Sequence, residues 1–170
     1  MRKSILMLAA AAAFAAAPAM AAIDTYVAFL NGANEVPGPG DADGFGVATL
    51  IVDNVASTVS WSMLALNIDM PLTGAHIHTG TAGTSGGVIV NFSGMLTGAD
   101  LFDADLALIN PANAADFYVN LHNAAYAMGA IRGQLQYVGT ASPPIPEPAT
   151  TALLLAGLGV VGFAARRRKV

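Results

Sequence analysis

Three histidines, His76, His78 and His122, are the residues of this 170-residue chain whose type and spacing best suit chemistry. Side chains alternate along an extended strand, so the imidazoles of a His-x-His run point to the same face. His122 falls on the polar face of a second alternating run, together with Tyr118 and Asn120. Three imidazoles from two strands form a ligand set for Zn²⁺ or Cu²⁺. The alternative is that these histidines hydrogen-bond the neighbouring glycine-rich loop and end their strands.

Other kinds of chemistry find little support in the sequence. The chain contains no cysteine, which excludes disulfides, thiolate zinc sites and a cysteine nucleophile. The glycine-rich run at residues 80–87 lacks the lysine of a phosphate-binding loop. The serines form no nucleophile elbow and the carboxylates no spaced acid–base pair, so we expect no enzymatic activity. Arg132, the only base between residues 22 and 147, is expected to pair with a buried carboxylate.

Residues 22–138 have the pattern of one all-β domain. Short alternating runs separated by glycine and asparagine turns predict an antiparallel β-sandwich. The predicted strands are Thr25–Leu30, Phe45–Val52, Thr58–Leu66, Gly74–Thr79, Gly87–Phe92, Asp116–His122 and Ala130–Val138. Thr97–Ile109 carries a threonine N-cap and leucines at helical spacing, which predicts a short helix crossing between the sheets.

The first 21 residues have the organisation of a secretory signal peptide. Arg2 and Lys3 precede an apolar stretch, and small residues close it at positions 19–21. We expect signal peptidase to cut between Ala21 and Ala22, with Ala19 as a second option, and the protein to leave the cytoplasm.

The other end of the chain predicts a single membrane pass. Residues 149–165 carry no charge and as a helix would span about 25 Å, the lower limit for crossing a bilayer. Residues 139–148 are proline-rich and predict an extended linker. Residues 166–170 form a basic tail, which is expected to stay cytoplasmic and keep the domain outside the inner membrane. Its charged residues are Arg166, Arg167, Arg168 and Lys169.

The net charge of −4 averages three unlike segments. Residues 1–21 carry +2, residues 22–147 carry −10 and residues 148–170 carry +4. Removal of both ends, with a cut just before Pro146, would leave a product of net charge −9. Such an acidic product is ill-suited to nucleic acid or to anionic lipid.

The segment from Pro146-Glu147-Pro148 through the apolar helix to the arginine cluster resembles the PEP-CTERM sorting signal of exported bacterial proteins. The resemblance implies that an exosortase-type membrane protease cuts near this motif. It also implies a Gram-negative host that makes exopolysaccharide, with delivery of the protein to the cell surface or the extracellular matrix.

Four motifs in the middle of the chain, at residues 34–37, 74–80, 117–122 and 129–135, resemble the CHRD domain, named after chordin. The resemblance implies an immunoglobulin-like sandwich with limited similarity to copper/zinc superoxide dismutases, and a biochemical activity that is undefined. With three histidines and no cysteine, this chain cannot complete a dinuclear copper–zinc dismutase site.

Two functions remain. The first, which we favour, is a non-catalytic cell-surface or matrix protein that engages exopolysaccharide, cations or other surface proteins. The second is a copper- or zinc-binding module that uses His76, His78 and His122, with the metal either structural or redox-active.

Overall fold

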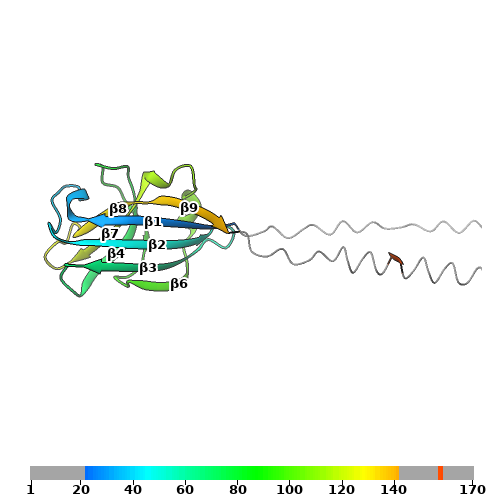
Figure 1. The fold of residues 1–170 in the computed structure, drawn as a ribbon, viewed down its shortest axis with the longest axis horizontal. Coiled ribbons are helices and arrows are strands. Elements are labelled where there is room, and N and C mark those ends of the chain that lie inside the picture. The colour runs from blue at the N-terminus through cyan, green and yellow to red at the C-terminus, as the bar shows by residue number, and fades with distance from the viewer. Residues whose placement is uncertain (1–21, 142–156, 159–170) are drawn as a thin grey trace, which may run out of the picture.

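A computed structural model describes residues 22–141 together with residues 157 and 158 (Figure 1). The predicted signal peptide, the Pro-Glu-Pro motif and the basic tail lie outside the described residues, as does most of the predicted membrane helix. Within the described part of the chain, no helix is long and apolar enough to cross a membrane.

The domain consists of antiparallel strands joined in one nine-stranded sheet. The order is β5-β4-β7-β8-β1-β2-β3-β6, and β9 also pairs with β1. The strands are β1 (Ile23–Asn31), β2 (Phe45–Asp53), β3 (Thr58–Leu66), β4 (Leu72–Thr79), β5 (Val88–Asn91), β6 (Thr97–Phe102), β7 (Phe117–Asn123), β8 (Ile131–Gln134) and β9 (Gln136–Ala141). Short 3-10 helices are η1 (Gly32–Asn34), η2 (Ala104–Leu108) and η3 (Ala114–Asp116). The prediction of an all-β domain is confirmed.

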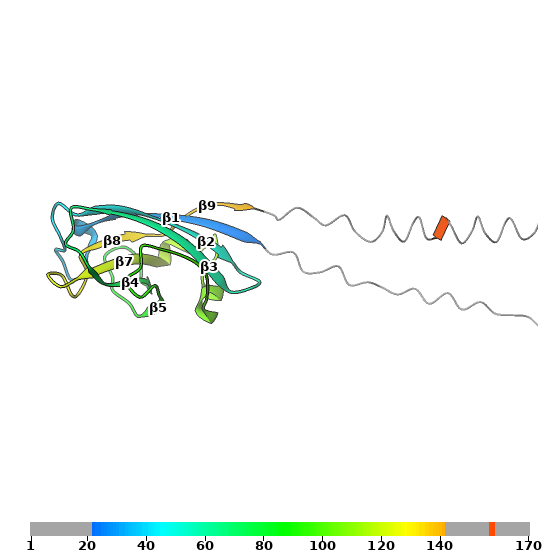
Figure 2. The same cartoon turned by 90° about the horizontal axis from the view of Figure 1, so that it is seen from below.

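The sheet curls so that its two halves face each other as layers. Figure 2 shows β1, β2, β3 and β9 above β4, β5 and β7. The alternation that predicted the strands places every second side chain between the layers. Leu50 and Trp61 enter this core from one half, and Ile77, Val119 and Leu121 enter it from the other. The opposite face of β4 and β7 is therefore left for polar residues.

The helix predicted at Thr97–Ile109 is wrong. Its first half is β6, which pairs with the outer edge of β3, and its second half contains η2. In the β3–β6 ladder Trp61 lies opposite Gly98, and its indole Nε1 donates to the carbonyl of Met95 at 2.9 Å. Hydrogen bonding to β3 thus outweighed the local preference for a helix that the leucine spacing indicated.

The single strand predicted at Ala130–Val138 is two strands. The first strand, β8, pairs with β7, and the second, β9, pairs with β1. The buried residue Leu135 lies between them, where the pairing partner changes. β9 runs past the expected domain boundary at 138, and Ala141 pairs with Ile23. The chain therefore enters and leaves the domain side by side at one end (Figure 1).

A candidate trihistidine metal site

The structure brings the three histidines together. His76 and His78 lie on β4 and His122 lies on the neighbouring β7. One ring nitrogen of each lies within 4.8 Å of the corresponding nitrogens of the other two. The ring centroids are 5.0 Å apart for His76 and His122, 5.5 Å for His76 and His78, and 6.0 Å for His78 and His122.

This cluster lies on the face of β4 and β7 that is turned away from the apolar core. Ala75 and Ile77, which alternate with the histidines, are fully buried between the layers. Gly86 and Ala127 nevertheless contact this face from loops, so that His78 is 9% exposed while His76 and His122 are half-buried. The cluster is thus a shielded polar site rather than an open surface patch.

Two loop carbonyls fix the orientation of two imidazoles. Nδ1 of His78 lies 3.1 Å from the carbonyl oxygen of Gly86, and Nδ1 of His122 lies 3.2 Å from that of Ala127. A carbonyl can only accept, so in a neutral imidazole Nδ1 carries the proton and Nε2 carries a free lone pair. Carbonyl partners of this kind orient metal-ligating histidines in proteins.

Each histidine also has one ring nitrogen without a hydrogen-bond partner in the described part of the protein. Nε2 of His78, Nε2 of His122 and Nδ1 of His76 are all buried and make no hydrogen bond. Buried polar atoms without a partner are uncommon, and three in one cluster point to a missing shared partner. The donor set is three imidazole nitrogens, which suits Zn²⁺ and Cu²⁺.

Burial keeps the cluster neutral. Burial, together with the neighbouring His122 and His78, lowers the pKa of His76 to about 4. Burial also lowers the pKa of His78 and of His122, and this outweighs the opposing effect of their carbonyl contacts. Neutral imidazole is the form that binds a metal, so the site is already in its binding protonation state near neutral pH.

Gly74 provides the space that the cluster needs. It lies opposite His122 in the β4–β7 ladder. A Cβ atom at position 74 would lie 2.7 Å from Cε1 of His76 and 3.4 Å from Cδ2 of His122. Any side chain here would push the first imidazole away, so the glycine has a packing role that strand propensity does not reveal.

Tyr118 and Arg132 form a second layer behind His78. The Tyr118 ring stacks on that imidazole, and the guanidinium carbon of Arg132 lies 3.4 Å from the centre of the same phenol ring. The predicted pairing of Arg132 with a carboxylate is replaced by other contacts. Its Nη2 donates to the carbonyl of Thr81 at 3.0 Å and to Oε1 of Gln134 at 2.9 Å.

A buried carboxyl group that interacts with Arg132 through its charge is Glu35, which the site prediction did not include. It is 6% exposed, and its Oε2 accepts a hydrogen bond from Asn120 at 3.3 Å. Burial raises the pKa of Glu35 to about 7, and this outweighs the lowering by Asn120 and by the charge of Arg132. The signal in the sequence was the Asn34–Pro37 motif, which carried the family resemblance but suggested no chemistry by itself.

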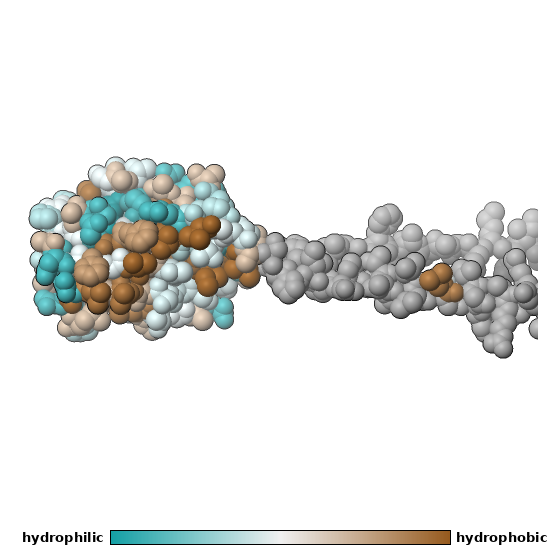
Figure 3. Space-filling view, in the orientation of Figure 1, coloured by the Kyte–Doolittle hydropathy of each residue, from teal (hydrophilic) through white to brown (hydrophobic). Residues whose placement is uncertain are grey.

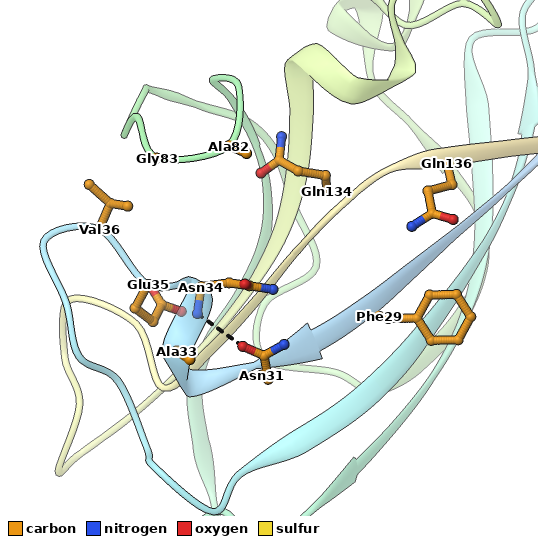
Figure 4. Close-up of a pocket in the computed structure, with 10 residues that line it drawn as sticks. All are labelled: Phe29, Asn31, Ala33, Asn34, Glu35, Val36, Ala82, Gly83, Gln134 and Gln136. Carbon is orange, nitrogen blue, oxygen red and sulfur yellow. Dashed lines mark hydrogen bonds between the residues drawn. The ribbon is translucent and has the colours of Figure 1, made fainter.

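Next to this polar layer a pocket opens at the far end of β1 (Figure 4). Its volume is about 460 Å³, within the range of small-molecule sites. It is lined by Phe29, Asn31, Ala33, Asn34, Glu35, Val36, Ala82, Gly83, Gln134 and Gln136, and is called the amide pocket below.

Comparison with known proteins gives two family matches. The model of the CHRD domain matches residues 26–135, and the PEP-CTERM protein-sorting motif matches residues 144–169. No curated protein and no solved structure matches the chain, so the likeness to immunoglobulin and dismutase sandwiches stays a prediction. The CHRD match covers more than half of the chain and includes every histidine of the cluster. The chain therefore belongs to the CHRD domain family and ends in a PEP-CTERM sorting motif.

Proposed function

We propose that this CHRD domain binds one transition-metal ion, Zn²⁺ or Cu²⁺, through His76, His78 and His122. One observation carries the proposal: each of the three histidines places a ring nitrogen within 4.8 Å of those of the other two, and each also has a buried ring nitrogen without a partner. The alternative role, in which the histidines only bond to loops, accounts for the two carbonyl contacts. It leaves the opposite nitrogens unpaired at a cost of about 1–3 kcal/mol each, which a bound ion would remove.

The metal holds the loops in place and the protein is not a catalyst. The two carbonyls that orient the histidines belong to the loops around Gly86 and Ala127, so ligation would fasten both loops to the sheet. Three protein ligands leave a fourth position for water or a surface ligand. A redox-active copper ion is the second candidate, favoured by the same all-nitrogen ligand set.

The test is metal stoichiometry of the full chain, purified in detergent from the membrane fraction. After stripping with chelator, we expect elemental analysis and calorimetric titration to give one Zn²⁺ or Cu²⁺ ion per chain. His78→Ala should abolish this binding, whereas Gln136→Ala, which lies outside the cluster, should not. Reduction of the copper form by ascorbate would identify a redox site. Substoichiometric metal at saturation would refute the proposal.

We further propose that the protein is sorted by an exosortase-type protease to the surface or matrix of a Gram-negative bacterium, where it associates with exopolysaccharide. The PEP-CTERM match at residues 144–169 and the expected signal peptide support this route. In a host with an exosortase, mass spectrometry of the matrix fraction should find a product ending near Pro146. Deleting the exosortase, or replacing Glu147 with alanine, should leave the uncut chain in the membrane. Identical processing in all three strains would contradict the proposal.

A further inference from the structure

The amide pocket is lined mainly by carboxamide and small side chains, together with one carboxyl group. It lies between η1, the loop at residues 80–87 and the β8–β9 connection (Figure 4). Four of its ten lining residues are asparagine or glutamine, and Glu35 is the one ionisable residue among them. A pocket with this lining offers a ligand mainly neutral hydrogen-bonding groups.

Several of these amides keep unused hydrogen-bonding groups. Oδ1 of Asn31 accepts from the backbone N–H of Asn34 at 2.9 Å, which leaves the Asn31 amino group available. Nδ2 of Asn34 donates to the carbonyl of Arg132 at 3.2 Å, which leaves its Oδ1 available. The side chain of Gln136 makes no hydrogen bond within the described part of the protein, so both ends of its amide are available. Donors and acceptors are therefore both present at the opening.

The wall behind these groups is already fixed. Nε2 of Gln134 donates to the carbonyls of Gly80 and Ala115, both at 2.8 Å, while its Oε1 accepts from Arg132. This amide thus joins β8 to two loops and has no free donor. A wall that is rigid before binding lowers the entropy that a ligand must give up.

At the rim of the pocket an aromatic ring faces outward. Phe29 is 57% exposed and lies on the outer face of β1, opposite Val47 of β2, which in turn lies opposite Leu64 of β3. Figure 3 shows apolar surface over these strands. An exposed ring beside free amides matches a ligand that presents C–H groups on one face and hydroxyls at its edges.

We propose that the amide pocket binds a neutral saccharide, with Phe29 stacking on a sugar ring and Asn31, Asn34 and Gln136 bonding its hydroxyls. Residues 22–141 hold ten carboxylates and one arginine, so the domain repels anionic sugars. This inference rests on the proposed association with exopolysaccharide and gives that association a location on the domain.

The test is affinity electrophoresis of the full chain in detergent, in gels containing dextran, galactomannan, hydroxyethylcellulose or anionic alginate. We expect at least one neutral polymer to slow the protein and alginate to leave it unaffected. Phe29→Ala and Gln136→Ala should each weaken binding about tenfold, a typical effect of losing one stacked ring or one bonded amide. Both side chains are exposed, so these variants keep the fold. Val138→Ala, which removes another exposed apolar side chain (63%) outside the pocket, is the matched control.

The outcomes separate this inference from the proposed function. No retardation by any neutral polymer, equal retardation by alginate, or unchanged binding of both pocket variants would overturn the saccharide site. Localisation is read in the producing bacterium, by fractionating cells, matrix and medium. If both pocket variants remain in the matrix like the parent, the association stands and the pocket is wrong. If the processed parent protein is found only in the medium, the association itself is wrong.

Discussion

The imidazole of His78 lies flat against the phenol ring of Tyr118, with centroids 4.9 Å apart and an angle of 7° between the rings. The two residues are register partners on β4 and β7, and Arg132 contacts the same phenol from β8. Because β7 lies between β4 and β8, the tyrosine separates the candidate ligand from the guanidinium. The orientation of the imidazole therefore depends on an arginine two strands away.

Arg132→Lys should destabilise the protein and weaken metal binding together. Lysine keeps the charge but cannot donate to Thr81 and Gln134 at once or lie flat on the phenol ring. We expect a loss of about 1–3 kcal/mol in urea unfolding, because at least one part-buried acceptor is left unpaired. Zn²⁺ titration should show weaker binding as Tyr118 loosens. Gln136→Ala should change stability by less than about 0.5 kcal/mol. Equal stability of the lysine variant and the parent would contradict the layered arrangement.

Gly74→Ala should impair the histidine cluster more than the fold. The added methyl would lie 2.7 Å from Cε1 of His76, so this imidazole must shift and the geometry of the cluster changes. We expect metal affinity to fall by roughly 10–100-fold, as when a ligand loses its support. Gly87→Ala is the control, since a Cβ there meets no atom within 4 Å. Calorimetric titration of both variants measures the effect, and equal affinities would mean that the cluster tolerates a side chain at position 74.

Metal affinity should change little between pH 8 and pH 6. Ordinary histidines are half protonated at about pH 6.5, and those protons compete with the metal. Burial lowers the pKa of all three histidines here and brings that of His76 to about 4, so competition is delayed to more acidic solution. Zn²⁺ titrations at several pH values measure the profile. A steep loss of affinity beginning at pH 7 would show that the imidazoles are exposed to solvent in the metal-free protein.

Glu35→Gln should stabilise the protein at pH 8 and have little effect at pH 4. The pKa of Glu35 is raised from 4.5 to about 7 in the folded state, so the folded protein holds a proton that the unfolded chain has released. Stability is therefore lost as pH rises from about 4.5 to 7 and stays constant above that range. Glutamine removes this loss, worth about 1–3 kcal/mol at pH 8, and keeps an oxygen that can accept from Asn120.

Urea unfolding of parent and variant at both pH values checks this prediction. In the parent, His76 changes the stability in the opposite direction. Because its pKa is lowered in the folded state, the free energy of unfolding rises between about pH 4 and 6.5. Because both proteins share that trend, their difference isolates Glu35. A difference that does not grow with pH would refute the buried-carboxylate explanation.

Strands with a clear alternation of polar and apolar residues were predicted from the sequence. The prediction failed for a segment whose secondary structure depends on pairing with another strand. Thr58–Leu66 alternates strictly from Thr58 to Met63 and forms β3 with the predicted bounds. Thr97–Ile109 has leucines at helical spacing, but the free edge of β3 recruits its first half as β6. No local pattern shows which strand edge is free, because that depends on the order of strands in the sheet.

Only part of the histidine site could be predicted, because the rest depends on the register between strands. His-x-His places two imidazoles on one face by geometry alone, and the alternation around His122 placed it on a polar face. The position of Gly74 opposite His122 depends on the register between β4 and β7, which the sequence does not display. Arg132 was expected to need a carboxylate, but amide, carbonyl and phenol contacts hold it instead.

Ile23 pairs with Ala141 where the chain enters and leaves the domain, so the response of the domain to a pulling force depends on the direction of the pull. The amide pocket includes Gln136 at the start of β9, and the chain leaves the domain at the other end of that strand. A pull between a polymer held at the pocket and a tether on the C-terminal side would therefore run lengthwise along β9. The hydrogen bonds between β1 and β9 lie across that direction, so they would be sheared together rather than peeled one at a time. Such a domain would resist the drag of flowing liquid better than one held by a strand that unzips from its end.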